Sequence, residues 1–239
     1  MPSPPKQNMP IQATQITHLT FDCYGTLIDW ENGILSALQS ILTPRGLHPA
    51  PEKLLQLFVA NEARLEAAAW KPYQMILQEV TRAIAGELGF ALKPTEQNAL
   101  ADSLPSWLPF PDTVPALRRL AKRFRLVILS NIDDALFAPT ARRLEVPFHE
   151  VITAEQVRSY KPGEAHFREA LRRLEVPAAQ ILHVAQSLYH DHPVARRLGF
   201  QTAWVRRPSR LPDTGLAPAA AIETDVAVDN LAELADLLE

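Results

Sequence analysis

The chain has 239 residues, 47% of them hydrophobic, which is enough to bury a sizeable core, and its formal net charge is -3 at pH 7. Charges of both signs are interspersed, so the sequence lacks the clustered basic face that a nucleic-acid partner requires. It also lacks a membrane-spanning apolar run and a signal-peptide pattern, and we expect a cytoplasmic protein without membrane or nucleic-acid partners.

The first expected elements are a flexible arm and a strand. Residues 1–15 are rich in proline and glutamine and form the arm. Residues 16–21, ITHLTF, are apolar and β-branched and predict a buried strand that delivers Asp22 at its end. The only cysteine, Cys23, follows, which excludes an internal disulfide and fits a reducing compartment.

Residues 33–107 have a helical pattern throughout. Apolar residues recur at helical spacing in ILSALQSIL, EKLLQLFVANEARLEAAAW and YQMILQEVTRAIAGELGF. Pro44, Pro51, Pro72 and Pro94 divide the region into about four helices, and no strand pattern interrupts them. The sequence therefore predicts an all-helical domain here.

From residue 108 onward, strands alternate with helices. The expected strands are 125–129, 150–153, 181–185, 201–205 and 225–228, and the expected helices are 113–124, 135–144, 166–174, 193–198 and 231–238. This alternation predicts a parallel sheet with helices on both faces. The predicted fold is α/β: a Rossmann-like core from residues 16–32 and 108–239, with an all-helical cap domain, residues 33–107, inserted into it.

The ends of the predicted strands carry polar residues. Asp22, Ser130 and Gln186 each stand at or just after such an end. In open parallel sheets, ligands bind at the carboxyl ends of the strands. We therefore expect these residues to lie close together, with the helical insertion placed over them as a lid.

Four segments carry a resemblance to a known family. FDCYGTLIDW, which begins at Phe21, resembles the first motif of the haloacid dehalogenase superfamily, an Asp after an apolar strand followed by Gly-Thr-Leu. LSN at 129–131, SYKP at 159–162 and HVAQSLYHD at 183–191 resemble the second, third and fourth motifs. The motifs occur in the family's order, and the resemblance covers the chain from about residue 16 onward.

The motif residues suit covalent catalysis by a carboxylate. Asp22 can attack an electrophilic carbon or phosphorus and form an ester. Lys161 supplies a positive charge beside it, and Asp191 can orient or deprotonate the water that cleaves the ester. Hydroxyl groups at the strand ends can orient an anion. The candidate catalytic residues are Asp22, Thr26, Ser130, Asn131, Lys161 and Asp191.

Two positions separate this chain from the phosphatases of the superfamily. Those phosphatases carry a general-acid Asp where this chain has Tyr24, and a magnesium-binding Asp where it has Gln186. Both differences point to carbon–halogen chemistry, because a leaving halide needs no proton and an amide is a poorer magnesium ligand than a carboxylate. The DxYGTL form resembles the L-2-haloacid dehalogenase branch. That resemblance implies hydrolysis of short (S)-2-haloacids to 2-hydroxy acids through an ester on Asp22, with inversion and without metal or other cofactor.

The helical cap is expected to complete the substrate pocket. The resemblance implies a lid arginine near the leaving halide, for which Asn61 and Arg64 are the candidate positions. Trp70 and Tyr73 suit an apolar pocket wall, and equally the core of the cap. The candidate substrate-binding residues are Tyr24, Asn61, Arg64, Trp70, Tyr73, Gln186 and Ser187.

Other interpretations stay open. A magnesium-dependent phosphatase acting on a small phosphate ester is one alternative, and a non-catalytic binding protein that retains the fold is another. Asp191 also suits a helix cap before Pro193, and His190 and His192 suit a metal site only if a third ligand converges. The expected partner is a small anionic substrate, and a homodimer stays open as well.

Overall fold

The core of the computed structural model, which describes residues 14–211 and 223–239, is a six-stranded parallel sheet. The strands lie in the order β3-β2-β1-β4-β5-β6. They are β1 (His18–Phe21), β2 (Arg125–Ser130), β3 (Glu150–Thr153), β4 (Ile181–Ala185), β5 (Gln201–Val205) and β6 (Val226–Val228). The predicted α/β class is confirmed. The predicted arm, residues 1–15, lies almost entirely outside the described residues.

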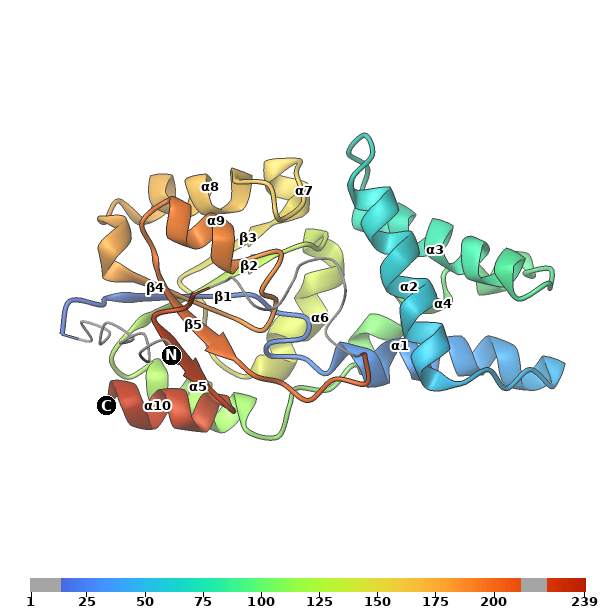
Figure 1. Ribbon diagram of the computed structural model, residues 1–239, viewed down its shortest axis with the longest axis horizontal. Coiled ribbons are helices and arrows are strands. Elements are labelled where there is room, and N and C mark those ends of the chain that lie inside the picture. Colours follow the sequence, from blue (N-terminus) through green and yellow to red (C-terminus); the bar gives the residue numbers. More distant parts are fainter. Residues whose placement is uncertain (1–13, 212–222) are drawn as a thin grey trace, which may run out of the picture.

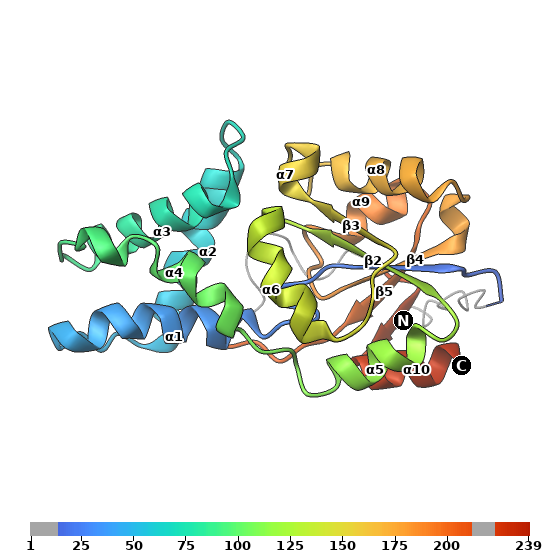
Figure 2. The same ribbon diagram turned by 180° about the vertical axis from the view of Figure 1, so that it is seen from behind.

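Helices cover both faces of the sheet, as Figures 1 and 2 show. One face carries α7 (Ala154–Val157), α8 (Ala165–Leu174) and α9 (His192–Arg197), and the other carries α5 (Thr113–Leu120), α6 (Asp134–Leu144) and α10 (Leu231–Leu238). A further 3-10 turn, Ala178–Gln180, precedes β4.

The side chains of β2 alternate between these two layers, because successive residues of a pleated strand point to opposite faces. Val127 and Leu129 belong to the apolar cluster that contains Phe167 of α8, whereas Leu126 and Ile128 belong to the larger cluster on the other face. Because both faces are covered, the strand reads as one continuous apolar run rather than an alternating one.

The chain between β1 and β2 is helical. It forms α1 (Trp30–Leu42), α2 (Pro51–Glu66), α3 (Tyr73–Glu87) and α4 (Ala99–Ser103), with 3-10 turns at Thr43–Arg45, Pro94–Glu96 and Leu104–Ser106. In Figure 1 these inserted helices stand beyond the end of the sheet toward which β1 runs. Helix α1 begins at Trp30 rather than at Gly33, because the carboxylate of Asp29 accepts a hydrogen bond from the N–H of Asn32 and caps the helix there.

Hydrogen bonds fasten the inserted helices to the core. The carboxylate of Asp133, which precedes α6, accepts bonds of 2.8 Å from the backbone N–H groups of Tyr73 and Gln74. These N–H groups open α3 and have no partner within the helix itself. The hydroxyl of Tyr160 donates to the carbonyl of Lys71 at 2.8 Å. The start of α3 is thereby held at the carboxyl edge of the sheet.

The expected bounds agree with the structure for β3, β4, β5 and α10 and differ by a few residues elsewhere. Helix α5 ends at Leu120 instead of Phe124, where the chain passes into turns. Helix α7 was not expected; it is a short turn of helix that Thr153 caps by accepting from the N–H of Gln156. Across residues 14–211 and 223–239, no helix is both long and apolar enough to span a membrane.

Candidate active site

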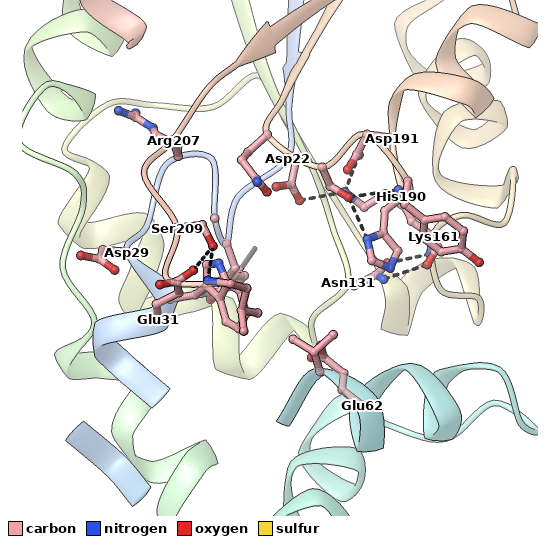
Figure 3. A pocket seen from close by; sticks show the side chains of 18 of the residues that line it. Asp22, Asp29, Glu31, Glu62, Asn131, Lys161, His190, Asp191, Arg207 and Ser209 are labelled. Atoms are coloured by element: carbon pink, nitrogen blue, oxygen red, sulfur yellow. Dashed lines mark hydrogen bonds and ion pairs between the residues drawn. The ribbon is translucent and has the colours of Figure 1, made fainter. Parts of the chain in front are cut away.

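Three strand ends open onto one pocket. Asp22 directly follows β1, Ser130 is the last residue of β2, and Gln186 directly follows β4. Because β1 pairs with both β2 and β4, these residues are neighbours at the carboxyl edge of the sheet. All three line a pocket of about 390 Å³ that the inserted helices close on the other side (Figure 3). The structure therefore brings together the residues that the sequence predicted to converge.

The carboxylate of Asp22 is held on both of its oxygens. Oδ2 accepts from the hydroxyl of Thr26 at 2.7 Å, and Oδ1 accepts from the ammonium of Lys161 at 2.8 Å. The hydroxyl of Thr26 also accepts from the backbone N–H of Gln186 at 2.9 Å, which ties the turn after β1 to the turn after β4. Thr26 is fully buried and outside the pocket wall, so it orients Asp22 rather than contacting a ligand.

The ammonium group of Lys161 connects the two carboxylates of the site. Lys161 is 2% exposed, and its ammonium donates to Asp22 Oδ1 at 2.8 Å, to Asp191 Oδ1 at 2.7 Å and to the carbonyl of Leu129 at 3.0 Å. An ammonium has three protons, so all of its donors are in use. Burial by itself lowers the pKa of Lys161, but the carboxylates of Asp191 and Asp22 outweigh burial and raise that pKa, so the side chain stays charged.

Asp191 is fully buried, and only one of its two oxygens has a hydrogen-bond partner within the described part of the chain. Oδ1 accepts from the ammonium of Lys161 and from Nε2 of His183 at 3.0 Å, whereas Oδ2 has no hydrogen-bond partner among the described residues. Burial by itself raises the pKa of Asp191, but the attraction of Lys161 outweighs burial and lowers it. Asp191 stands at the start of α9 without capping it. Its side chain instead presents a carboxylate at the pocket wall.

Ser130 and Asn131 complete this side of the pocket. The hydroxyl of Ser130 is buried and has no partner among the described residues. Asn131 accepts from the backbone N–H of Lys161 at 2.7 Å and donates to the carbonyl of Lys161 at 3.2 Å, which holds the loop that carries the lysine against the end of β2. Buried polar groups are normally paired, so the hydroxyl of Ser130 is a group that a ligand can satisfy.

The pocket wall includes the expected residues Tyr24, Tyr73, Gln186 and Ser187. The hydroxyl of Tyr24 shares a hydrogen bond of 3.0 Å with the hydroxyl of Thr140. The phenol group is therefore bonded to α6 and not to the carboxylates of the site. The hydroxyl of Ser187 shares a bond of 2.9 Å with the ring of His190.

Asn61, Arg64 and Trp70 do not line this pocket, in contrast to their expected substrate-binding role. Asn61 donates to the carbonyl of Leu57 and to the carboxylate of Glu87, both at 2.9 Å, and Arg64 donates to the side-chain oxygen of Asn61 at 3.1 Å. The indole of Trp70 packs under the guanidinium of Arg158 instead, with 5.1 Å between the guanidinium carbon and the ring centre.

Another face of α2 forms the pocket wall. Glu62 and Glu66 line it together with Phe58, and Figure 3 shows Glu62 across the pocket from Asp22. Burial raises the pKa of Glu62 to about 7. Burial, and then the charge of Glu62, raise the pKa of Glu66 well above its usual value. These two residues are not among the predicted site residues; they follow Phe58 by four and by eight positions, so helical spacing places all three on one face of α2.

Each glutamate also has a partner. Glu62 accepts a short hydrogen bond from the hydroxyl of Tyr73, and both oxygens of Glu66 lie near the side-chain amide of Asn131, at 3.3 and 3.4 Å. In place of the arginine that the resemblance implied, the inserted helices thus present carboxyl groups that hold their protons to an unusually high pH.

The two histidines beside Asp191 do not converge. His190 bonds to Ser187, and the ring of His192 donates to the carbonyl of Ala185 at 3.1 Å. Within the described ranges, no cluster of three or more His, Cys, Asp and Glu side chains is arranged to hold a metal ion. Cys23 is buried, and burial raises the pKa of its thiol well above the usual value, which suits a packing role beside Asp22.

A parallel α/β sheet, a helical insertion after its first strand and a carboxylate–lysine cluster at the carboxyl edge together define a class of hydrolases. The family model of haloacid dehalogenase-like hydrolases matches residues 16–199, and the chain belongs to this family.

Relatives within the family act on different substrates. The chain is 26% identical to (S)-2-haloacid dehalogenase H-109 of Pseudomonas putida, over 93% of this chain and 98% of that protein. It is 30% identical to the 5-amino-6-(5-phospho-D-ribitylamino)uracil phosphatase YigB of Escherichia coli K12, over 80% of this chain and 84% of that protein. Its fold superposes on L-2-haloacid dehalogenase from Xanthobacter autotrophicus with a TM-score of 0.79, at 21% identity over 93% of this chain and 98% of that one.

Proposed function

We propose that the chain hydrolyses short (S)-2-haloacids to 2-hydroxy acids through an ester on Asp22. The observation that carries the proposal is the arrangement around Asp22. Thr26 and Lys161 fix its carboxylate in the pocket wall, and the neighbouring positions hold the uncharged side chains of Tyr24 and Gln186. The similarity to an (S)-2-haloacid dehalogenase over nearly the whole chain supports the same assignment.

In the first step, an oxygen of Asp22 attacks C2 of the haloacid, the carbon–halogen bond breaks and halide leaves. The substrate carboxylate requires hydrogen-bond donors other than Lys161, whose three protons are already used. The unpartnered hydroxyl of Ser130 suits this task, because a preorganised donor in a buried site stabilises an anion more than water-exposed donors do.

In the second step, water attacks the carbonyl carbon of the Asp22 ester while Oδ2 of Asp191 takes its proton. Oδ2 suits this role because it is the oxygen that has no partner among residues 14–211 and 223–239. The 2-hydroxy acid leaves with an oxygen that came from Asp22, and the oxygen of the water stays in the enzyme. Only the first step touches C2, so the configuration at that carbon inverts.

A magnesium ion does not fit this donor set. The Oδ1 atoms of Asp22 and Asp191 both accept from the ammonium of Lys161, and the remaining motif position holds the amide of Gln186. Magnesium prefers carboxylate oxygens and water, and of the four oxygens of these two carboxylates only Oδ2 of Asp191 is without a hydrogen-bond partner among the described residues.

The leaving halide departs on the side of C2 opposite the attacking oxygen, toward the inserted helices. Glu62 and Glu66 stand there, while the pocket-lining arginines, Arg206 and Arg207, are paired with Asp229 and Asp112. A protonated carboxyl group donates a hydrogen bond, so the neutral glutamates can stabilise the departing halide.

The test is a panel of L- and D-2-haloacids and small phosphate esters, each with and without chelator, in which halide and phosphate release are measured. Halide release from L-2-haloacids that survives chelator is the expected result. Phosphate release that depends on magnesium would assign the chain to the phosphatases instead. Binding without any turnover across the panel would favour a non-catalytic protein.

The pKa of Glu62, about 7, predicts a pH dependence. We expect kcat/KM to fall as pH rises from 6 to 8.5, by roughly tenfold, because an ionised Glu62 repels the anionic substrate and no longer donates to halide. The pKa of Asp191 is lowered and that of Lys161 is raised, so neither titrates in this window. Glu62→Gln keeps a neutral donor at every pH, so its profile should fall less steeply than that of the wild type, and the fall that remains reports Glu66, whose pKa is also raised. Glu79→Gln, outside the pocket wall, is the matched control, and a Glu62→Gln profile as steep as that of the wild type would contradict the role of Glu62.

Arg64→Ala and Asn61→Ala should each lower kcat/KM by less than about tenfold, because neither side chain lines the pocket. Steady-state kinetics on one good L-2-haloacid measure this. An inactive Arg64→Ala enzyme with an unchanged melting temperature would show that the arginine reaches the halide during turnover.

A further inference from the structure

Behind Asp191, away from the pocket, lies a buried pair that the two steps above do not use. His183 is the third residue of β4 and Thr20 is its paired neighbour on β1; both are fully buried. Nδ1 of His183 shares a hydrogen bond of 2.9 Å with the hydroxyl of Thr20, and Nε2 lies 3.0 Å from Oδ1 of Asp191. The three side chains form one continuous chain from the sheet to the pocket wall.

The protonation of this chain follows from its last member. An ionised carboxylate only accepts hydrogen bonds, so Nε2 of His183 must carry a proton and donate it to Asp191. The hydroxyl of Thr20 can donate or accept, so it pairs with Nδ1 whether or not that nitrogen carries a proton, and it holds the ring in the orientation that points Nε2 at Asp191.

We propose that Thr20 and His183 are positioning residues that hold Asp191 during ester hydrolysis, the second step of the function proposed above, on which this inference rests. Lys161 and His183 both donate to Oδ1, which restrains the carboxylate at the pocket wall and leaves Oδ2 without a partner among the described residues. The two donors differ in one respect. Lys161 also donates to Asp22, whereas His183 has no bond to Asp22.

The difference becomes important once the ester has formed. Esterification removes the negative charge of Asp22. The attraction between Asp22 and the ammonium of Lys161 is then weaker, and the position of the ammonium between the two carboxylates can change. The bond from His183 to Asp191 does not depend on the charge of Asp22. His183 is therefore the constant restraint on the carboxylate in the step in which Asp191 takes a proton from water.

This placement predicts a selective kinetic defect. His183→Phe removes both ring nitrogens while keeping an aromatic ring beside Phe167, whose ring centre lies 4.9 Å away. We expect kcat to fall by about tenfold or more, kcat/KM to change by less than about threefold, and the Asp22 ester to accumulate with a burst of halide. Mass spectrometry of quenched enzyme measures the ester, and rapid-quench kinetics of halide release measure the burst.

Two further variants separate positioning from folding. Thr20→Val removes only the hydroxyl and should give a smaller defect of the same kind. His183→Gln retains an N–H that can reach Asp191 and should recover part of kcat relative to His183→Phe. They decide the question even if His183→Phe does not fold.

The outcomes distinguish this inference from the function on which it rests. A wild-type enzyme that forms no ester with any substrate of the panel overturns both. A wild-type enzyme that forms and hydrolyses the ester, with variants in which kcat and kcat/KM fall together and no ester accumulates, overturns the positioning role alone.

Discussion

Asp22→Asn abolishes turnover, with residual kcat below about one thousandth of the wild-type value. The amide has nearly the shape of the carboxylate but lacks the charge and the nucleophilic lone pairs that attack carbon. The fold should persist, because Lys161 keeps Asp191 and the carbonyl of Leu129 as partners. Halide release measures activity, and circular dichroism with the melting temperature measures folding.

Asp29→Asn is the matched control for this substitution. Asp29 also lines the pocket, lies outside the carboxylate–lysine cluster, and caps α1 through an oxygen that asparagine retains. Its activity should stay within about tenfold of wild type. An Asp22→Asn enzyme that remains as active as Asp29→Asn would exclude Asp22 as the nucleophile.

Heavy-oxygen water provides the second measurement on Asp22. In a single turnover with enzyme in excess, the label should enter the peptide that contains Asp22, because water cleaves the ester at its carbonyl carbon. Label found only in the 2-hydroxy acid would show that water attacks C2 directly and would remove the covalent step.

Lys161→Ala lowers kcat/KM by at least about a hundredfold. A haloacid carboxylate and Asp22 are both anions, and two unit charges ~4 Å apart at an effective dielectric of ~20 repel by about 4 kcal/mol. A barrier increase of that size slows a reaction by roughly a thousandfold. Lys161 offsets this repulsion because its charge lies 2.8 Å from Asp22 and 2.7 Å from Asp191.

Folding must be separated from catalysis in this variant, because removing one partner of a buried ion pair costs about 3 to 5 kcal/mol. Lys161→Met fills the same space and tests the loss of charge with less loss of packing. Lys161→Arg should not restore activity fully, since a planar guanidinium does not match three acceptors gathered around one nitrogen. Lys71→Ala, which removes a partly exposed ion pair with Glu79, is the control. A folded Lys161→Met enzyme with near-normal kcat/KM would contradict the charge argument.

Sequence patterns were sufficient to place the catalytic candidates. A short apolar strand has a defined end, and the carboxyl ends of neighbouring parallel strands meet at one edge. Asp22 and Ser130 were placed by that rule, and the structure brings them to one pocket. Lys161 and Asp191 follow from the order of the motifs, although they stand on loops whose path the pattern does not define.

In the inserted helices, the sequence predicts the elements but not which of their side chains line the pocket. Helical periodicity identified α2 correctly, but each residue of a helix turns the direction of its side chain by about 100°, so an error of one position selects another face. Asn61 and Arg64 are the positions expected in the substrate pocket, whereas the structure places Glu62 and Glu66 in the pocket wall. The orientation of α2 depends on how its buried residues, such as Leu54 and Phe58, pack with the rest of the core, which local periodicity does not encode.

What the sequence by itself determined is the fold class, the strand ends and the residue types delivered to them, because these depend on local periodicity and on chain order. What only the tertiary structure decided is the pairing among those groups. The bonds from Lys161 to its three acceptors and the bond from His183 to Asp191 join segments that are distant in sequence or separated by a turn. The same contacts determine that Oδ2 of Asp191 is left without a partner among the described residues. Such contacts depend on packing to within a fraction of an ångström, and a carboxylate becomes a base or a mere ion-pair partner according to which of its oxygens is left free.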